Sequence, residues 1–244
     1  YLASWFENRA DRDVKNLHTG LIPFVTSLGA IMLLIILQPD VGTMAVIVAI
    51  ALGVYFVAGA ATSHLLLLGG AGAALFFLLI RLAPYRAARF MTFLHPELDP
   101  QGIGYHINQA LLAVGSGGLF GLGYGHSRQK FQYLPEVAGD SIFAVIAEEL
   151  GFVLSAGVIV LFIFFPRQML RIAASAPDRF SQYFVVGTAT WIAFQAFVNI
   201  GAMLGMLPIT GIPLPFISYG GTSLVVLLSA MGIVMNISKH RTHA

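Results

Sequence analysis

The chain has 244 residues, of which 57% are hydrophobic and only 10% charged, and its mean hydropathy is +0.83. Soluble domains carry about 25% charged residues, so this composition excludes an ordinary soluble domain and indicates an all-α, polytopic membrane helix bundle. The net charge of +2 is too small to indicate a nucleic-acid partner, and the absence of cysteine excludes disulfide and thiolate–metal chemistry.

Six apolar segments approach the roughly 20 residues that a helix needs to cross hydrocarbon. The predicted transmembrane helices are residues 19–37, 41–58, 65–82, 141–165, 183–204 and 216–237. They divide the chain into a charged connector (1–18), three spans (19–83), a large loop (84–140), three further spans (141–237) and a tail (238–244). The chain opens on Tyr1 in a charged segment without a signal-peptide pattern, which suggests that a longer protein continues upstream.

The large loop at 84–140 is rich in glycine and in charged residues. A structureless loop of this length is uncommon in a compact protein, so we expect it to be folded, with a short amphipathic helix near residues 105–114. Eight Lys and Arg residues lie in the two ends of the chain and in the 166–181 connector, against five on the other side. Because basic residues favour the cytoplasmic side, we predict a cytoplasmic (inner) membrane protein with both ends cytoplasmic and the loop extracytoplasmic.

Asp140 stands at the boundary between this loop and the fourth span. Pro135 and Gly139 favour a turn, so Asp140 should fall at or near the N-cap of the span, where Asp is a favoured residue. The helix dipole stabilises a charged carboxylate there. We therefore expect Asp140 to be ionised at neutral pH and able to accept a proton from a bound hydroxyl. Simple capping is the alternative role, and the two roles are compatible.

Two further carboxylates, Glu148 and Glu149, lie in the same run, which continues into the apolar span without a break. They are about 12 to 14 Å further along the helix axis and point in other directions, so they cannot pair closely with Asp140. A polar partner or a water-filled cavity must satisfy them in the membrane. A structural polar pair and a proton relay are both open readings.

Other polar features surround this boundary. The glycine-rich run 115–125, followed by Arg128 and Lys130, offers backbone N–H groups and cations to a phosphate, although it lacks the P-loop pattern. Gln195 and Asn199 form one polar patch on the fifth span, suited to interhelical hydrogen bonds. Prolines and the Ser218–Gly221 run break the start of the sixth span on the side of Asp140. The histidines show no metal-ligand spacing, so no metal site is predicted.

Four motifs, in this order, resemble those of the SEDS family, which contains the FtsW, RodA and SpoVE peptidoglycan polymerases. They are Gln38–Thr43, Gly115–Lys130, Leu134–Gly151 and Leu214–Gly221. Their order and spacing match over nearly the whole chain. Family members have ten membrane spans, so the resemblance implies that the six spans here are the last six.

The resemblance implies a peptidoglycan glycosyltransferase that polymerises lipid II at the outer face of the membrane, with Asp140 as general base for the acceptor 4-hydroxyl. Attack at the anomeric carbon would release undecaprenyl pyrophosphate with inversion. The implied substrate-binding residues are Arg128, Lys130, Glu136, Ser218, Tyr219 and Gly220. No cofactor is identifiable, and a divalent cation (Mg or Mn) is an alternative to Arg128 and Lys130 for neutralising the pyrophosphate. The implied partners are a class B penicillin-binding transpeptidase and other division or elongation proteins.

Some positions depart from the family pattern. Ala138 and Gly139 replace a common His-Thr pair, and Ser141 replaces the usual Phe. The run 127–136 is more like FtsW, whereas 208–213 is equally like RodA; the chain is therefore predicted to be FtsW-like, while division and elongation stay open. A transporter (flippase) of the lipid-linked precursor and a non-enzymatic scaffold for a transpeptidase are the alternative functions. The fragment alone is expected to be inactive.

Overall fold

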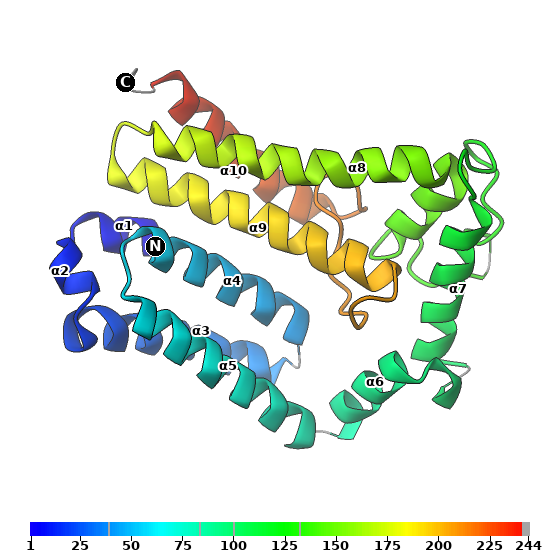
Figure 1. Cartoon of the computed structure of the whole chain (residues 1–244), viewed down its shortest axis with the longest axis horizontal. Helices are drawn as coiled ribbons and strands as arrows, with labels where there is room; N and C mark the ends of the chain where they lie inside the picture. The colour runs from blue at the N-terminus through cyan, green and yellow to red at the C-terminus, as the bar shows by residue number, and fades with distance from the viewer. Residues whose placement is uncertain (39, 83, 100, 132, 241–244) are drawn as a thin grey trace. The chain divides into compact units, whose positions relative to one another are not determined.

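Every regular element of the computed structural model is a helix within its described residues, which are 1–38, 40–82, 84–99, 101–131 and 133–240 (Figure 1). Pro39 of the first motif and residues 241–244 of the predicted tail lie outside this range. In chain order the elements are α1 Leu2–Glu7, α2 Asp11–Val14, a π-helix Leu17–Leu21, α3 Ile22–Leu37, α4 Val41–Val57, α5 Thr62–Leu82, α6 Pro84–Leu94, a 3-10 helix Pro96–Leu98, α7 Ile103–Ser116, α8 Ile142–Ala174, α9 Arg179–Met203 and α10 Gly221–Lys239.

Each of the six predicted spans corresponds to an apolar helix, and this confirms the all-α membrane class. Four helices are long and apolar enough to cross a membrane: Leu17–Leu37, Ile142–Ala174, Arg179–Met203 and Gly221–Lys239. The other two predicted spans correspond to the shorter apolar helices Val41–Val57 and Thr62–Leu75. The protein is therefore a multi-pass membrane protein, and the count of six spans stays a prediction. The expected helix at 105–114 is α7.

Most of the predicted connector 166–181 is helical. Helix α8 continues through Pro166 to Ala174, and α9 begins at Arg179. Proline often ends a helix because it lacks a backbone donor, but membrane helices tolerate it where the freed backbone groups find other partners. The start of α9 is fixed instead by Asp178, whose carboxylate accepts hydrogen bonds from the backbone N–H and the hydroxyl of Ser181.

The chain forms two compact units. The first consists of Tyr1–Ala73, Phe164–Phe194 and Val225–Ala244, and the second of Ala74–Ile163 and Gln195–Leu224. In the first unit, the ring of Tyr55 stacks on Phe24 with centroids 4.4 Å apart, and on Phe6 at 5.6 Å. The Tyr55 hydroxyl also lies 2.8 Å from Nδ1 of His64. These contacts join the charged N-terminal connector to the predicted spans of this unit.

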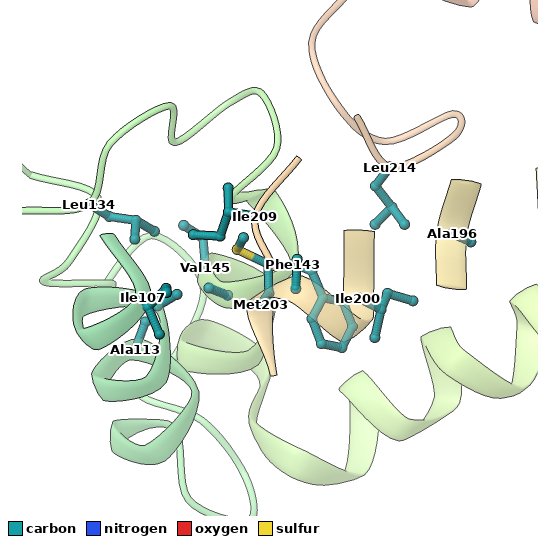
Figure 2. Packing of buried hydrophobic residues seen from close by; sticks show 13 residues of the cluster. Ile107, Ala113, Leu134, Phe143, Val145, Ala196, Ile200, Met203, Ile209 and Leu214 are labelled. Atoms are coloured by element: carbon teal, nitrogen blue, oxygen red, sulfur yellow. The ribbon is translucent and has the colours of Figure 1, made fainter. Parts of the chain in front are cut away.

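The second unit has a core that gathers α7, the start of α8 and the last turns of α9 with two loops (Figure 2). Its buried residues are Ile107, Ala110 and Ala113 of α7, Leu134, Phe143, Ala144 and Val145 around the start of α8, Ala196, Ile200, Ala202 and Met203 of α9, and Ile209 and Leu214 of the following loop. Because Phe143 is anchored in this core with 1% of its surface exposed, the preceding turn is held at a defined place. That turn carries Asp140.

Candidate active site

Asp140 lines a cavity of about 210 Å³ in the second unit. Three segments form its wall, namely α7, the turn before α8 and the loop after α9. The lining residues are Ile103, His106, Glu136, Asp140, Ile209, Thr210 and Gly211. The cavity therefore presents two carboxylates, one imidazole and one hydroxyl on an otherwise apolar wall.

The backbone of the turn is held by three separate donors. The backbone N–H of Tyr219 donates to the carbonyl of Ala138 at 2.7 Å, and the Ser218 hydroxyl donates to that of Gly139 at 2.6 Å. The side-chain amide of Asn199 donates to the carbonyl of Asp140 at 2.7 Å. Three consecutive carbonyls thus have partners from α9 and from the 214–219 loop, which holds the backbone of the turn that carries Asp140.

Ser141 links the same turn to α7. Its hydroxyl lies 2.7 Å from the carbonyl oxygen of Pro135 and 2.6 Å from Nε2 of His106. The Asp140 carboxylate is further away, with 3.4 Å between Ser141 Oγ and Oδ1. Ser141 is fully buried and Asp140 is 9% exposed, so these contacts lie out of bulk water.

Burial changes the electrostatics of Asp140. Burial raises the pKa of the Asp140 carboxyl above its ordinary value, against the opposing influence of His106, and the charge of Glu136 raises it further. Burial lowers the pKa of His106, while Asp140 and Glu136 act to raise it. Ionisation of Asp140 at neutral pH stays a prediction, because α8 begins at Ile142 and burial makes the charged form costlier.

Glu148 and Glu149 belong to a second polar cluster, built with the loop that carries the predicted phosphate-binding residues. The Glu148 carboxylate accepts hydrogen bonds from the Ser127 hydroxyl and from the backbone N–H groups of Arg128 and Gln129. That of Glu149 accepts from backbone N–H groups of the same loop, at Gly125 and Ser127. These bonds support the structural reading of the pair.

The cations of this loop have different environments. The Lys130 ammonium lies 2.5 Å from Oε1 of Glu149 and forms an ion pair with it. Lys130 thus has a partner inside the protein, and its phosphate role stays a prediction. The Arg128 side chain is exposed.

The sequence predicts an unbroken run from Asp140 into the span, but the helix is interrupted. Gly151 interrupts α8 with φ 74° and ψ −177°, a conformation open almost only to glycine. The glycine-rich loop supplies the hydrogen bonds that the break leaves unmade. The N–H groups of Leu122 and Gly123 donate to the carbonyls of Glu148 and Glu149, respectively. Those of Phe152 and Val153 donate to the carbonyls of Gly118 and Leu119. The glycines here serve close backbone packing.

The predicted site residues therefore fall into two groups. Asp140 and Glu136 share the cavity, and Ser218, Tyr219 and Asn199 hold its turn. The second group is the cluster of Glu148, Glu149, Arg128 and Lys130. Gly220 directly precedes α10, and Gln195 is buried on α9 one turn before Asn199.

His106 is a titratable residue of the cavity that the sequence did not indicate. It is a lone histidine without metal-ligand spacing. The one available signal was its position three residues after Ile103, at the edge of the apolar face of α7.

The donor set does not fit a metal held by the protein. Within the described part of the chain, no group of three or more His, Asp or Glu side chains lies close enough to hold a metal ion. His106, Glu136 and Asp140 share the cavity without forming such a group. A divalent cation stays an untested expectation.

Comparison with known proteins agrees with these features. The family model described as "Cell cycle protein", for the FtsW, RodA and SpoVE proteins, matches residues 1–243. Stage V sporulation protein E of Bacillus subtilis is 43% identical over 96% of this chain and 64% of the relative. The "Probable peptidoglycan glycosyltransferase FtsW" of Trichlorobacter lovleyi is 39% identical over 98% of this chain and 62% of the relative.

Solved structures resemble the fold over the whole chain. One belongs to work on "polymerization and crosslinking by a peptidoglycan synthase complex", with TM-score 0.79, 29% identity and 67% of that chain covered. Another is the rod shape determining protein RodA of Thermus thermophilus, with TM-score 0.61, 29% identity and 62% of that chain covered.

Fold and site together define a polytopic helical membrane protein with a carboxylate cavity at the end of a helix bundle. The chain belongs to the FtsW, RodA and SpoVE family, the SEDS proteins. It spans about 64% of the length of its Bacillus subtilis relative.

Proposed function

We propose that the protein containing this chain is a peptidoglycan glycosyltransferase that polymerises lipid II at the outer face of the cytoplasmic membrane. The observation that carries the proposal is Asp140, a nearly buried carboxylate in a cavity, on a turn whose three carbonyls are all held. A fixed carboxylate in a site of low water content suits a general base. The names of the relatives support the reaction class.

In the proposed reaction, the ionised Asp140 carboxylate takes the proton of the acceptor 4-hydroxyl as that oxygen bonds to the anomeric carbon of the donor. The bond from this carbon to the pyrophosphate oxygen breaks, and undecaprenyl pyrophosphate leaves with inversion. The leaving group is already a good one and needs charge neutralisation more than a proton. Arg128, which is exposed, is the proposed cation for it. Glu136, Ser218, Tyr219 and Gly220 are the proposed groups around the substrate.

The proposed partner is a class B penicillin-binding transpeptidase, together with other division or elongation proteins. One structural neighbour belongs to a peptidoglycan synthase complex in which polymerisation is coordinated with crosslinking, and this supports a partner of that kind. Each of the alternative functions, transporter and scaffold, predicts a different effect of removing the Asp140 carboxylate.

The test compares the full-length protein with its Asp140→Ala variant in three assays: glycan formation from lipid II, lipid II flipping in proteoliposomes, and transpeptidase binding. The proposal predicts loss of glycan formation alone. Loss of flipping with glycan formation intact would favour the transporter, and no loss in any assay would favour the scaffold. Asp11→Asn is the control, because Asp11 is exposed in the other unit and pairs with Arg179 at the surface.

A further inference from the structure

His106 lines the same cavity as Asp140 but has no part in the proton transfer proposed above. It is on α7, whereas Asp140 and Ser141 are on the turn before α8. The contact between His106 and Ser141 joins positions 35 residues apart in sequence. It is therefore a tertiary link between two walls of the cavity.

The hydrogen-bond geometry fixes the role of each atom in this link. The Pro135 carbonyl oxygen, 2.7 Å from Ser141 Oγ, can only accept, so the single hydroxyl proton of Ser141 points to it. The short 2.6 Å contact with His106 then needs a proton on Nε2. His106 is thus the donor to Ser141, and its ring is the Nε2–H tautomer.

We propose that His106 is a positioning residue of the site: its Nε2–H donates to Ser141, which in turn closes on Pro135 and thereby fixes the turn that carries Asp140. This inference rests on the proposed glycosyltransferase function. The backbone donors from Asn199, Ser218 and Tyr219 hold one side of the turn. The link from His106 through Ser141 holds the opposite side, from α7.

The charge state of His106 agrees with this role. Burial lowers its pKa, and the groups acting against this are the carboxylates of Asp140 and Glu136 in the same cavity. A neutral ring still has the one N–H that the link needs. His106 therefore acts through a hydrogen bond and does not have to be a cation.

The kinetic test uses the full-length protein with lipid II. His106→Ala and Ser141→Ala should each lower kcat about 3- to 10-fold with little change in KM, because one hydrogen bond of the link is lost. The double variant should be no slower than either single variant, because the two side chains act through each other. His106→Gln should restore most of kcat, since its amide donates from a similar place. His126→Ala, which changes an exposed histidine of the neighbouring loop, should match the wild type.

A second measurement does not depend on activity. Nitrogen-15 spectra of histidine-labelled protein in proteoliposomes should show His106 as the Nε2–H tautomer, identified by loss of its signals in His106→Gln. Ser141→Ala should move the His106 Nε2 signal and leave that of His126 in place. An Nδ1–H tautomer, or a His106 signal that Ser141→Ala does not move, would overturn the link.

The two measurements separate the two claims. If the wild type makes no glycan, the proposed function fails, and the spectra alone decide the His106–Ser141 link. If the wild type is active, wild-type kcat in His106→Ala overturns the positioning role. Additive losses in the double variant, or no rescue by His106→Gln, would overturn it as well.

Discussion

Asp140 has two properties that matter for a general base: it lies on a rigid turn, and its carboxyl is nearly buried. Its turn is rigid because three consecutive carbonyls are held by donors from α9 and the 214–219 loop. Its carboxyl is also 9% exposed, and burial makes the charged form costly. A raised pKa makes the ionised carboxylate a stronger base at the pH where it has lost its proton.

The activity should depend on pH through this residue. Only the ionised carboxylate accepts a proton, so kcat/KM should fall as the pH decreases through the pKa of Asp140. Burial places that pKa above the ordinary aspartate value of about 3.9. Because the charge of Glu136 raises it further, Glu136→Gln should move the acidic limb to lower pH.

The measurement is kcat/KM for lipid II polymerisation between about pH 4 and pH 8, in the wild type and in Glu136→Gln. Glu97→Gln is the matched control, because Glu97 is exposed and pairs with His95. A limb in Glu136→Gln at the wild-type pH or above it would contradict the electrostatic coupling of these two carboxylates.

Among the elements, α8 and the glycine-rich loop depend on each other. The loop supplies the backbone bonds that the break at Gly151 leaves unmade, and the carboxylates of Glu148 and Glu149 hold the following residues of the loop. Broken helices at membrane depth persist only where such partners exist. The loop is therefore part of the helix bundle.

Gly151→Ala should destabilise the protein by about 3 kcal/mol or more, which corresponds to a melting temperature lower by at least about 5 °C. The new Cβ would meet the backbone nitrogen of Gly121 at 2.2 Å, at a φ that alanine avoids. Gly157→Ala in the same helix is the control, because its Cβ meets nothing within 4 Å. Thermal unfolding in detergent checks both variants, and equal melting temperatures would refute the importance of the break.

Glu148→Gln should loosen the loop at residues 127–129. One carboxylate oxygen becomes an amide NH₂, so at least one of the three donors from Ser127, Arg128 and Gln129 loses its acceptor. Hydrogen exchange of peptides covering this segment should be about tenfold faster or more. The exposed Glu7 provides the control as Glu7→Gln, and unchanged exchange in Glu148→Gln would show that the carboxylate does not hold the loop.

At the scale of the whole molecule, the sidedness of the membrane spans decides where the cavity works. From the distribution of basic residues we predict that the 84–140 loop lies outside and the end of α10 inside. Since the chain has no cysteine, single cysteines can report this in the full-length protein with any other cysteines replaced. Tyr133→Cys should react with a membrane-impermeant maleimide in intact spheroplasts, whereas Lys239→Cys should react only after permeabilisation. The reverse pattern would place the cavity on the cytoplasmic side.

The sequence predicts this molecule well where the signal is local. Apolar length locates the spans, and a carboxylate after a Pro and a Gly locates Asp140. The contact of His106 with Ser141 has no local signal, because it depends on how α7 packs against α8.

The break in α8 at Gly151 also could not be predicted from the local sequence. A single glycine inside an apolar helix is usually tolerated, and nothing local shows that a distant glycine-rich run will pack against it. The same run is predicted to offer donors to a phosphate, and its packing against α8 has no local signal either. The ion pair of Lys130 with Glu149 likewise has no local signal.

The central claim is that one carboxylate, Asp140, acts as the base. The most direct measurement is the rate of glycan formation from lipid II by full-length Asp140→Asn, a variant of the same size without a basic oxygen. We expect a loss of about 100-fold or more, with transpeptidase binding and melting temperature unchanged. Glycan formation by Asp140→Asn within a few-fold of the wild type would contradict the claim.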